Sequence, residues 1–262
     1  MKQVIINGDD FGLSDGISSG IVHCMHHGCV SSTTIMPCVD GAMERLEQWE
    51  SRITGSLGVH LQLTCGKPRS PIETINSLLV NNAFPVDVEA VEDLSVDEVE
   101  KEWSAQIEAV MEGGRAITHL DSHHGHHRCD RLIDVYVRLA QRYGLAARGG
   151  SQEVCRRLSD NGVVTTDLCD SRWLRGEKTV DRFVNLLLED FDQLGGDGTV
   201  EIVTHPGFVD DGLHKVTRYS EQRGKELEVL CSKELVTCLR RNGIELINYG
   251  TLLDQSESRT IS

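Results

Sequence analysis

The sequence predicts an α/β protein built on a parallel sheet that closes into a barrel or a barrel-like curl. Short apolar runs alternate with longer segments of helical period, which is the pattern of βα units. This alternation extends over nearly all of the 262 residues, and no composition shift or internal repeat divides them. We therefore expect one domain over residues 1–253, followed by a flexible tail at 254–262.

Seven short apolar runs are the expected strands. They lie at 3–8, 30–36, 57–64, 116–122, 145–148, 200–205 and 244–249. The first helix is expected to begin after Ser14, a residue type that caps helices. A capping box at Ser95–Glu98 opens a helix that runs to about residue 112, where Gly113 and Gly114 end it. Apolar residues at three-to-four spacing predict further helical segments at 130–143, 180–194 and 221–241.

Residues 66–94 interrupt this alternation. They hold three of the five prolines and show no clean period over most of their length. Such a segment inside a compact domain is more often a functional excursion than a linker. We therefore predict a lid over a site.

The charge balance limits the kinds of partner. There are 26 Lys and Arg against 41 Asp and Glu, a formal net charge of −15. The resulting field repels phosphate backbones and anionic lipid surfaces, so nucleic acid and membranes are not expected as partners. No run of about 18 apolar residues is present that would span a bilayer.

The chain also lacks the marks of a secreted protein. Its first apolar stretch passes directly into polar residues at 7–10, without a small-residue cleavage site. Nine cysteines without CxxC spacing fit neither a disulfide framework nor a zinc ribbon. We therefore expect a cytoplasmic protein with reduced, mostly buried thiols, and a homodimer, because most soluble oligomers are twofold.

Residues that bind metals gather where the expected strands end. Period-2 alternation places His60 on the interior side of its strand, opposite the apolar set. His119 and Asp121 share a face that continues to His123, and His205 ends another strand just before a Pro-Gly break. The first strand ends in two aspartates. In parallel barrels the carboxyl ends of the strands form one rim, so these side chains are expected to meet.

Two imidazoles and one carboxylate are a usual ligand set for a divalent ion, with positions left open for water and substrate. The rim therefore predicts a hydrolytic metal site. One alternative is a metallophosphoesterase, although such sites usually need two ions and more positive charge. Another is a non-catalytic metal- or sugar-binding protein that uses the histidines at 124, 126 and 127.

Four motifs resemble those of the YdjC-like carbohydrate deacetylases, which include the chitooligosaccharide deacetylases. They are NGDDFGLS at 7–14, GVHLQLT at 58–64 with GKP at 66–68, THLDSHH at 118–124 and THPGF at 204–208. They occur in the family's order, and the similarity continues to ELEVL at 226–230. The resemblance implies an irregular (β/α) barrel of the glycoside hydrolase/deacetylase type and metal-dependent removal of an N-acetyl group from an amino sugar or short chito-oligosaccharide.

Residue by residue, the resemblance implies a catalytic set. Asp10, His60 and His123 correspond to the metal ligands, Asp9 to the general base and His205 to the general acid. Amide hydrolysis needs an activated water, stabilisation of the oxyanion and a proton for the departing nitrogen. A single divalent ion, Mg or Zn, would bind and activate the nucleophilic water, and Asp9 and His205 would move the protons.

Other residues have supporting roles in this interpretation. Asp121 is expected to orient an imidazole, and Arg148 is expected to pair with a site carboxylate or contact sugar hydroxyls. His124 and His127 are candidate substrate contacts in the histidine-rich loop. Trp173 is the tryptophan best placed to stack on a sugar ring, because the other two lie in helical patterns. The metal, the sugar, its chain length and the oligomeric state are left open at this stage.

Overall fold

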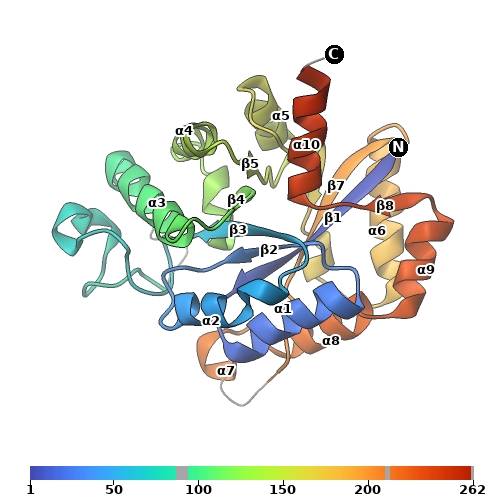
Figure 1. Cartoon of the computed structure of the whole chain (residues 1–262), viewed down its shortest axis with the longest axis horizontal. Coiled ribbons are helices and arrows are strands. Elements are labelled where there is room, and N and C mark those ends of the chain that lie inside the picture. The colour runs from blue at the N-terminus through green and yellow to red at the C-terminus, as the bar shows by residue number, and fades with distance from the viewer. Residues whose placement is uncertain (87–93, 210–212, 261–262) are drawn as a thin grey trace.

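The computed structural model describes residues 1–86, 94–209 and 213–260. At its centre is a curled half-barrel of parallel strands in the order β5-β4-β3-β2-β1-β7-β6 (Figure 1). The start of β1 also pairs with β8, while its later residues pair with β2. The strands are β1 Lys2–Phe11, β2 Ser32–Ile35, β3 Ser56–Leu61, β4 His119–Ser122, β5 Ala146–Ala147, β6 Leu168–Asp170, β7 Gly198–Thr204 and β8 Ile244–Leu246. This confirms the predicted fold class.

Each of the seven predicted runs overlaps a strand, but β6 was not predicted. It has three residues and lies at an edge of the sheet, where it pairs with β7. A strand of that length cannot display a period, and an edge strand does not need a continuous apolar run.

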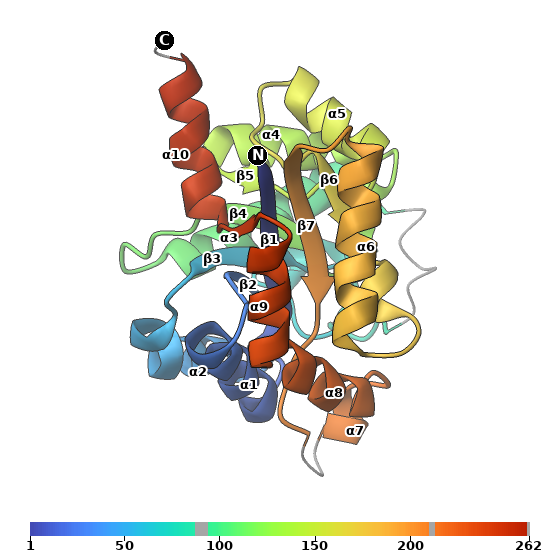
Figure 2. The same ribbon diagram turned by 90° about the vertical axis from the view of Figure 1, so that its right-hand side faces the viewer.

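Helices surround the outside of the curled sheet (Figure 2). They are α1 Asp15–His27, α2 Ala42–Trp49, α3 Val96–Met111, α4 Ile133–Tyr143, α5 Gln152–Asp160, α6 Val180–Gln193, α7 Leu213–Val216, α8 Glu221–Leu230, α9 Lys233–Arg241 and α10 Tyr249–Thr260. The single helical segment expected at 221–241 is wrong. It divides into α8 and α9 because Ser232 caps α9, its Oγ accepting a hydrogen bond from the Leu235 N–H at 3.1 Å.

The helix ends test the capping signals directly. Ser14 caps α1 as expected, with its Oγ accepting from the Ile17 N–H at 3.1 Å. Ser95 is the N-cap residue of α3, but its side chain makes no capping hydrogen bond. The expected capping box is therefore wrong, because Glu98 instead accepts from the Ser77 N–H at 2.8 Å and ties α3 to the preceding segment.

Residues 254–260, where a flexible tail was expected, continue α10, and the domain boundary at residue 253 stays a prediction. This helix begins at Tyr249, whose ring stacks on His119 at a centroid distance of 3.9 Å. The Tyr249 hydroxyl donates to Glu201 Oε2 at 2.7 Å. Around it packs a small apolar cluster of Ile5, Ala146, Ile247 and Leu252. Tyr249 is thus the buried anchor of α10 in the interior of the sheet. Residues 261–262 lie outside the described part.

The segment 66–94 was predicted to form a lid, and the structure describes its residues 66–86 and 94. It contains two short 3-10 helices, Ile72–Thr74 and Asn76–Leu78, and a bridge between Val80 and Ala83. The part of the prediction that falls on 87–93 lies outside the described residues. Its role as a lid stays a prediction.

All nine cysteines are free thiols in the structure, but four are buried and five are half-buried, so the expectation that most are buried is wrong. None of the helices within the described ranges combines the length and apolar content needed to cross a membrane.

A pair of carboxylates on the outer side of β6 makes stability depend on pH. Burial and the neighbouring Asp170 raise the pKa of Asp190 to about 7, although both carboxylates contact Arg172. Because the folded state holds this proton more tightly than the unfolded state, the stabilisation is present at pH 4 and is lost as the pH rises through 7. We predict that Asp190→Asn raises Tm at pH 8 by a few degrees, at about 2–4 °C per kcal/mol, and much less at pH 5.

Thermal melts at the two pH values check this prediction. Asp192→Asn, on the exposed side of the same helix, is the matched control and should shift Tm little at either pH. An Asp190→Asn variant that melts lower than the parent at pH 8 would show that the ionised carboxylate stabilises the fold.

Candidate active site

Two adjacent aspartates reach the same site at the end of β1. In a regular strand, Asp9 and Asp10 would point to opposite faces of the sheet. Asp10 instead has a left-handed backbone with φ of 68°, and the pairing of β1 with β2 shifts register between Gly8 and Phe11. Such irregularities re-aim side chains. Both carboxylates are therefore buried at the same rim.

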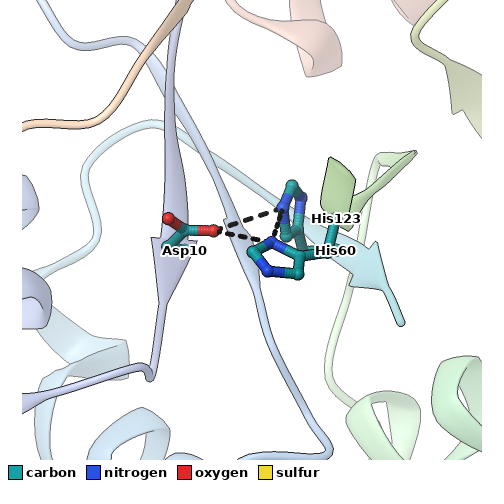
Figure 3. A group of neighbouring side chains, drawn as sticks. All are labelled: Asp10, His60 and His123. Atoms are coloured by element: carbon teal, nitrogen blue, oxygen red, sulfur yellow. Dashed lines mark hydrogen bonds and ion pairs between the residues drawn. The ribbon is translucent and has the colours of Figure 1, made fainter. Parts of the chain in front are cut away.

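Three ligand-type atoms converge beside β1. Figure 3 shows Asp10, His60 and His123 pointing toward one another from β1, β3 and the turn after β4. Asp10 Oδ1 lies 3.3 Å from His60 Nε2 and 3.3 Å from His123 Nδ1, and the two nitrogens are 3.3 Å apart. The predicted ligand set is thus brought together and can hold a metal ion.

The orientation of His60 is fixed from behind. Its Nδ1 lies 2.7 Å from Asp121 Oδ1, which leaves Nε2 facing Asp10. Thr34 donates to the other oxygen of Asp121 at 2.9 Å. A carboxylate behind an imidazole selects the tautomer and increases its basicity. Burial works to lower the pKa of His60, but Asp121 and Asp10 outweigh it and raise the pKa to about 10.

Asp9 is held by a buried guanidinium. Arg148 donates from Nη1 and Nη2 to the two oxygens of Asp9, both at 2.7 Å, and Asn7 donates to Oδ1 at 2.8 Å. Burial works to raise the pKa of Asp9, but Arg148 outweighs it and holds the pKa below its ordinary value. Asp9 is therefore ionised. It could also group with His60 and Asp121 around an ion, but Arg148 already occupies both carboxylates.

His205 faces the two aspartates from the end of β7. Its Nε2 lies 3.9 Å from Asp9 Oδ2 and 3.8 Å from Asp10 Oδ2. Burial lowers its pKa, and the two carboxylates offset this only in part. A lowered pKa makes the imidazolium a stronger acid and reduces the fraction that carries the proton at neutral pH. His205 is thus placed to exchange a proton with a group bound between it and Asp9.

The charges around the site leave room for a cation. Among the described residues, Asp9, Asp10, Asp121 and Glu201 are paired with two guanidiniums, Arg148 and Arg223. Two negative charges therefore remain when His60 is neutral, as an imidazole that binds a metal must be. Asp10 Oδ1 is buried and accepts no hydrogen bond from the described residues. An unpartnered carboxylate oxygen beside two imidazole nitrogens is suited to a divalent ion.

The three residues predicted to contact the substrate differ in exposure. His124 is exposed and has a left-handed backbone with φ of 58°, and its Nδ1 lies 2.9 Å from Thr64 Oγ1. His127 is buried between Ser122 and the Gly149 carbonyl. Arg148 was expected either to pair with a carboxylate of the site or to contact sugar hydroxyls. It is buried and pairs with Asp9. Neither His127 nor Arg148 presents a surface to a sugar.

The sugar-stacking role expected for Trp173 is wrong. Its side chain is fully buried, packed edge-on against Phe183 at a centroid distance of 5.0 Å and beneath Lys178. The charged residues that flank it in the sequence suggested exposure, but the short 3-10 helix Arg172–Leu174 turns the indole inward. Trp103 is buried in the core and Trp49 packs against the core, as expected.

Two functional-looking residues on α8 were not predicted. Arg223 donates to Asp10 Oδ2 at 2.5 Å, and Glu226 accepts from the His205 N–H at 2.7 Å. Glu226 was visible only as the start of the ELEVL motif. A charged residue on a helix gives no sequence signal that it faces inward, because its partner is distant in the chain.

Comparison with known proteins decides the family. The family model described as YdjC-like protein matches residues 3–241. The chain belongs to the YdjC-like family. Among the relatives of this YdjC-like protein, the carbohydrate deacetylase of Thermoanaerobacter pseudethanolicus is 33% identical, covering 96% of this chain and 100% of the relative. The chitooligosaccharide deacetylase of Proteus mirabilis is 32% identical, with 95% and 98% covered.

Solved structures agree with the YdjC-like fold. A protein of Enterococcus faecalis, described as a cellobiose-phosphate cleavage protein, superimposes with a TM-score of 0.86 at 33% identity, covering 96% of this chain and 98% of that one. A family 4 acetyl xylan esterase from Clostridium thermocellum, solved with cobalt, matches with a TM-score of 0.50 at 11% identity, covering 97% and 91%. The latter similarity concerns the fold alone.

Proposed function

We propose that this chain is a metal-dependent carbohydrate deacetylase that removes an N-acetyl group from an amino sugar or a short chito-oligosaccharide. The observation that carries the proposal is the convergence of Asp10, His60 and His123, with Asp9 and His205 beside them. The names of the relatives support the same activity.

Zinc is the metal that the donor set favours. Two imidazole nitrogens and one carboxylate oxygen are usual zinc ligands, whereas magnesium prefers oxygen ligands. Asp10, His60 and His123 would hold the ion. When bound, such an ion polarises a carbonyl and lowers the pKa of a water molecule.

The chain's own residues would move the protons. Asp9, kept ionised and aimed by Arg148 and Asn7, accepts the proton of the attacking water. His205 delivers a proton to the amine that leaves when the amide bond breaks. The exposed ring of His124, held by Thr64, contacts the sugar at the mouth of the site.

The metallophosphoesterase alternative finds less support. Phosphate ester sites use free cationic groups to bind the phosphate. The two guanidiniums of this site, Arg148 and Arg223, are each engaged by carboxylates.

Acetate release tests the proposal. Protein stripped with a chelator is incubated with N-acetylglucosamine and its short β-linked oligomers, with and without added Zn, Mg, Mn or Co. We expect no acetate from the stripped protein and restored release with the preferred metal, with at least one oligomer as substrate. If no metal supports acetate release while the same samples hydrolyse a nitrophenyl phosphate ester, the phosphoesterase alternative holds instead.

A further inference from the structure

Helix α8 turns two charged side chains toward the proposed catalytic groups. Arg223 and Glu226 lie nearly one helical turn apart, so they project from the same face. Their exposed fractions are 2% and 0%, whereas Lys225 and Glu228 of the same helix are exposed. Burial of an Arg and a Glu is rare unless each has a defined partner.

The partner of Arg223 is Asp10. Its Nη2 donates to Asp10 Oδ2 at 2.5 Å, and its Nε donates to the Tyr219 carbonyl at 2.8 Å. The oxygen of Asp10 that faces the histidines is Oδ1, so Arg223 occupies the other one. Asp10 can then offer only a single oxygen to an ion.

The partner of Glu226 is the main chain of His205. Its Oε2 accepts from the His205 N–H at 2.7 Å, and its Oε1 accepts from the Tyr219 hydroxyl. Lys178 Nζ lies 3.5 Å from Oε1 and balances the buried charge. His205 directly follows the end of β7. The contact with Glu226, together with the Gly207 N–H that donates to the Arg223 carbonyl at 3.3 Å, holds the segment that carries the imidazole against α8.

We propose that Arg223 and Glu226 are positioning residues for the deacetylation. Arg223 keeps Asp10 as a one-oxygen ligand and neutralises part of its charge, and Glu226 anchors His205. The proposal rests on the proposed function, because it takes Asp10 as a metal ligand and His205 as the acid.

The role of Arg223 predicts opposite changes in metal affinity and turnover. The Arg223 guanidinium is separated from the bound cation only by the carboxylate of Asp10, so the two positive charges repel each other. Arg223 also favours metal binding slightly by ordering the Asp10 side chain, but this entropic gain is small for so short a side chain and the repulsion outweighs it. Removing the charge should therefore tighten metal binding. It should also slow turnover, because Asp10 is then free to chelate with both oxygens, which closes a position that the reaction needs, and donates more charge to the ion. Damage to the fold would weaken both.

The experiment compares Arg223→Gln with Arg223→Lys and with Lys225→Gln as the matched surface control. Metal affinity is measured on stripped protein by competition with a chromophoric zinc chelator, without substrate. Turnover is measured as acetate release, and folding by circular dichroism. For Arg223→Gln we expect at least about tenfold tighter zinc binding and at least about tenfold lower kcat. Arg223→Lys should return the zinc affinity toward that of the parent.

Glu226→Ala forms a second arm, with Glu228→Ala as its control. Its zinc affinity should stay within about threefold of the parent, because Glu226 does not touch Asp10, while kcat falls at least about tenfold with KM little changed. Glu226→Gln, whose amide oxygen can still accept from the His205 N–H, should return kcat toward that of the parent. This pattern differs from that of Arg223→Gln. A simultaneous loss of zinc affinity in Glu226→Ala would show a merely structural role.

Asp10→Asn separates the failure of this inference from the failure of the proposed function. If Asp10→Asn leaves zinc affinity unchanged, Asp10 is not a ligand and the proposed metal site is wrong. If Asp10→Asn weakens binding but Arg223→Gln weakens it as well or leaves it unchanged, only the positioning role of Arg223 is overturned. Should Arg223→Gln fail to fold, Arg223→Met is the second neutral variant to be scored in the same way.

Discussion

Replacing Asp9 by Asn is expected to lower kcat for acetate release by about 10²–10⁴, the range typical of losing a general base. Asn has the shape of Asp but cannot accept a proton at neutral pH. Arg148 keeps its contacts with Asp121 and Glu201, so the buried guanidinium retains partners in the variant. The measurement is kcat with saturating metal, together with zinc affinity from chelator competition.

The zinc affinity of Asp9→Asn should remain within a few-fold of the parent, because Asp9 lies outside the ligand set of Asp10, His60 and His123. Asp160→Asn, on the exposed end of α5, is the control and should leave both quantities unchanged. Full activity in Asp9→Asn would remove Asp9 from the mechanism. A large loss of zinc affinity would instead place it among the ligands.

Replacing His123 by Ala is expected to abolish both metal binding and acetate release. Loss of an outer-shell partner of a metal ligand already weakens binding by about 10–100-fold, so loss of a ligand should exceed that range. His123 is at the rim, with 13% of its side chain exposed, and its removal leaves the core packing intact. Metal content after dialysis and kcat at fixed zinc are the two measurements.

His124→Ala is the natural control because His124 is the adjacent residue but lies outside the ligand set. It should retain the metal and alter mainly the KM for the sugar, in keeping with its exposed position. If His124→Ala loses the metal and His123→Ala keeps it, the assignment of ligands in this loop is wrong.

The fold was predictable where strands were long enough to show a pattern. The runs around β3 and β7 alternate, the run around β1 is a continuous apolar stretch, and the structure places strands at all three. The edge strand β6 and the break between α8 and α9 depend on pairing and on a single capping serine, which act below the length at which periodicity is visible. The continuation of α10 past residue 253 depends on the anchoring of its first turn by Tyr249, a tertiary contact.

The candidate site was predictable to the extent that its residues end strands. Alternation along β3 and β7 places His60 and His205 on the interior face of their strands. Because the carboxyl ends of parallel strands form one rim, these residues are then expected to meet. The contacts of Arg223 and Glu226 depend instead on how α8 packs, which no local pattern encodes. The error at Trp173 has the same origin, because charged neighbours in the sequence do not determine which way an indole turns.

The left-handed backbone of Asp10 bears on how this chain could lose its activity. A non-glycine residue in that conformation costs about 1–3 kcal/mol and persists only where its surroundings enforce it. Glycine or asparagine adopts the same conformation more readily, so either substitution would relieve that strain. Either would also leave the buried guanidinium of Arg223 without its carboxylate partner, and breaking a buried ion pair costs about 3–5 kcal/mol, more than the strain relieved. Aspartate at residue 10 is therefore held by stability as well as by chemistry, and a relative that has lost its activity should keep Asp10 for as long as it keeps Arg223.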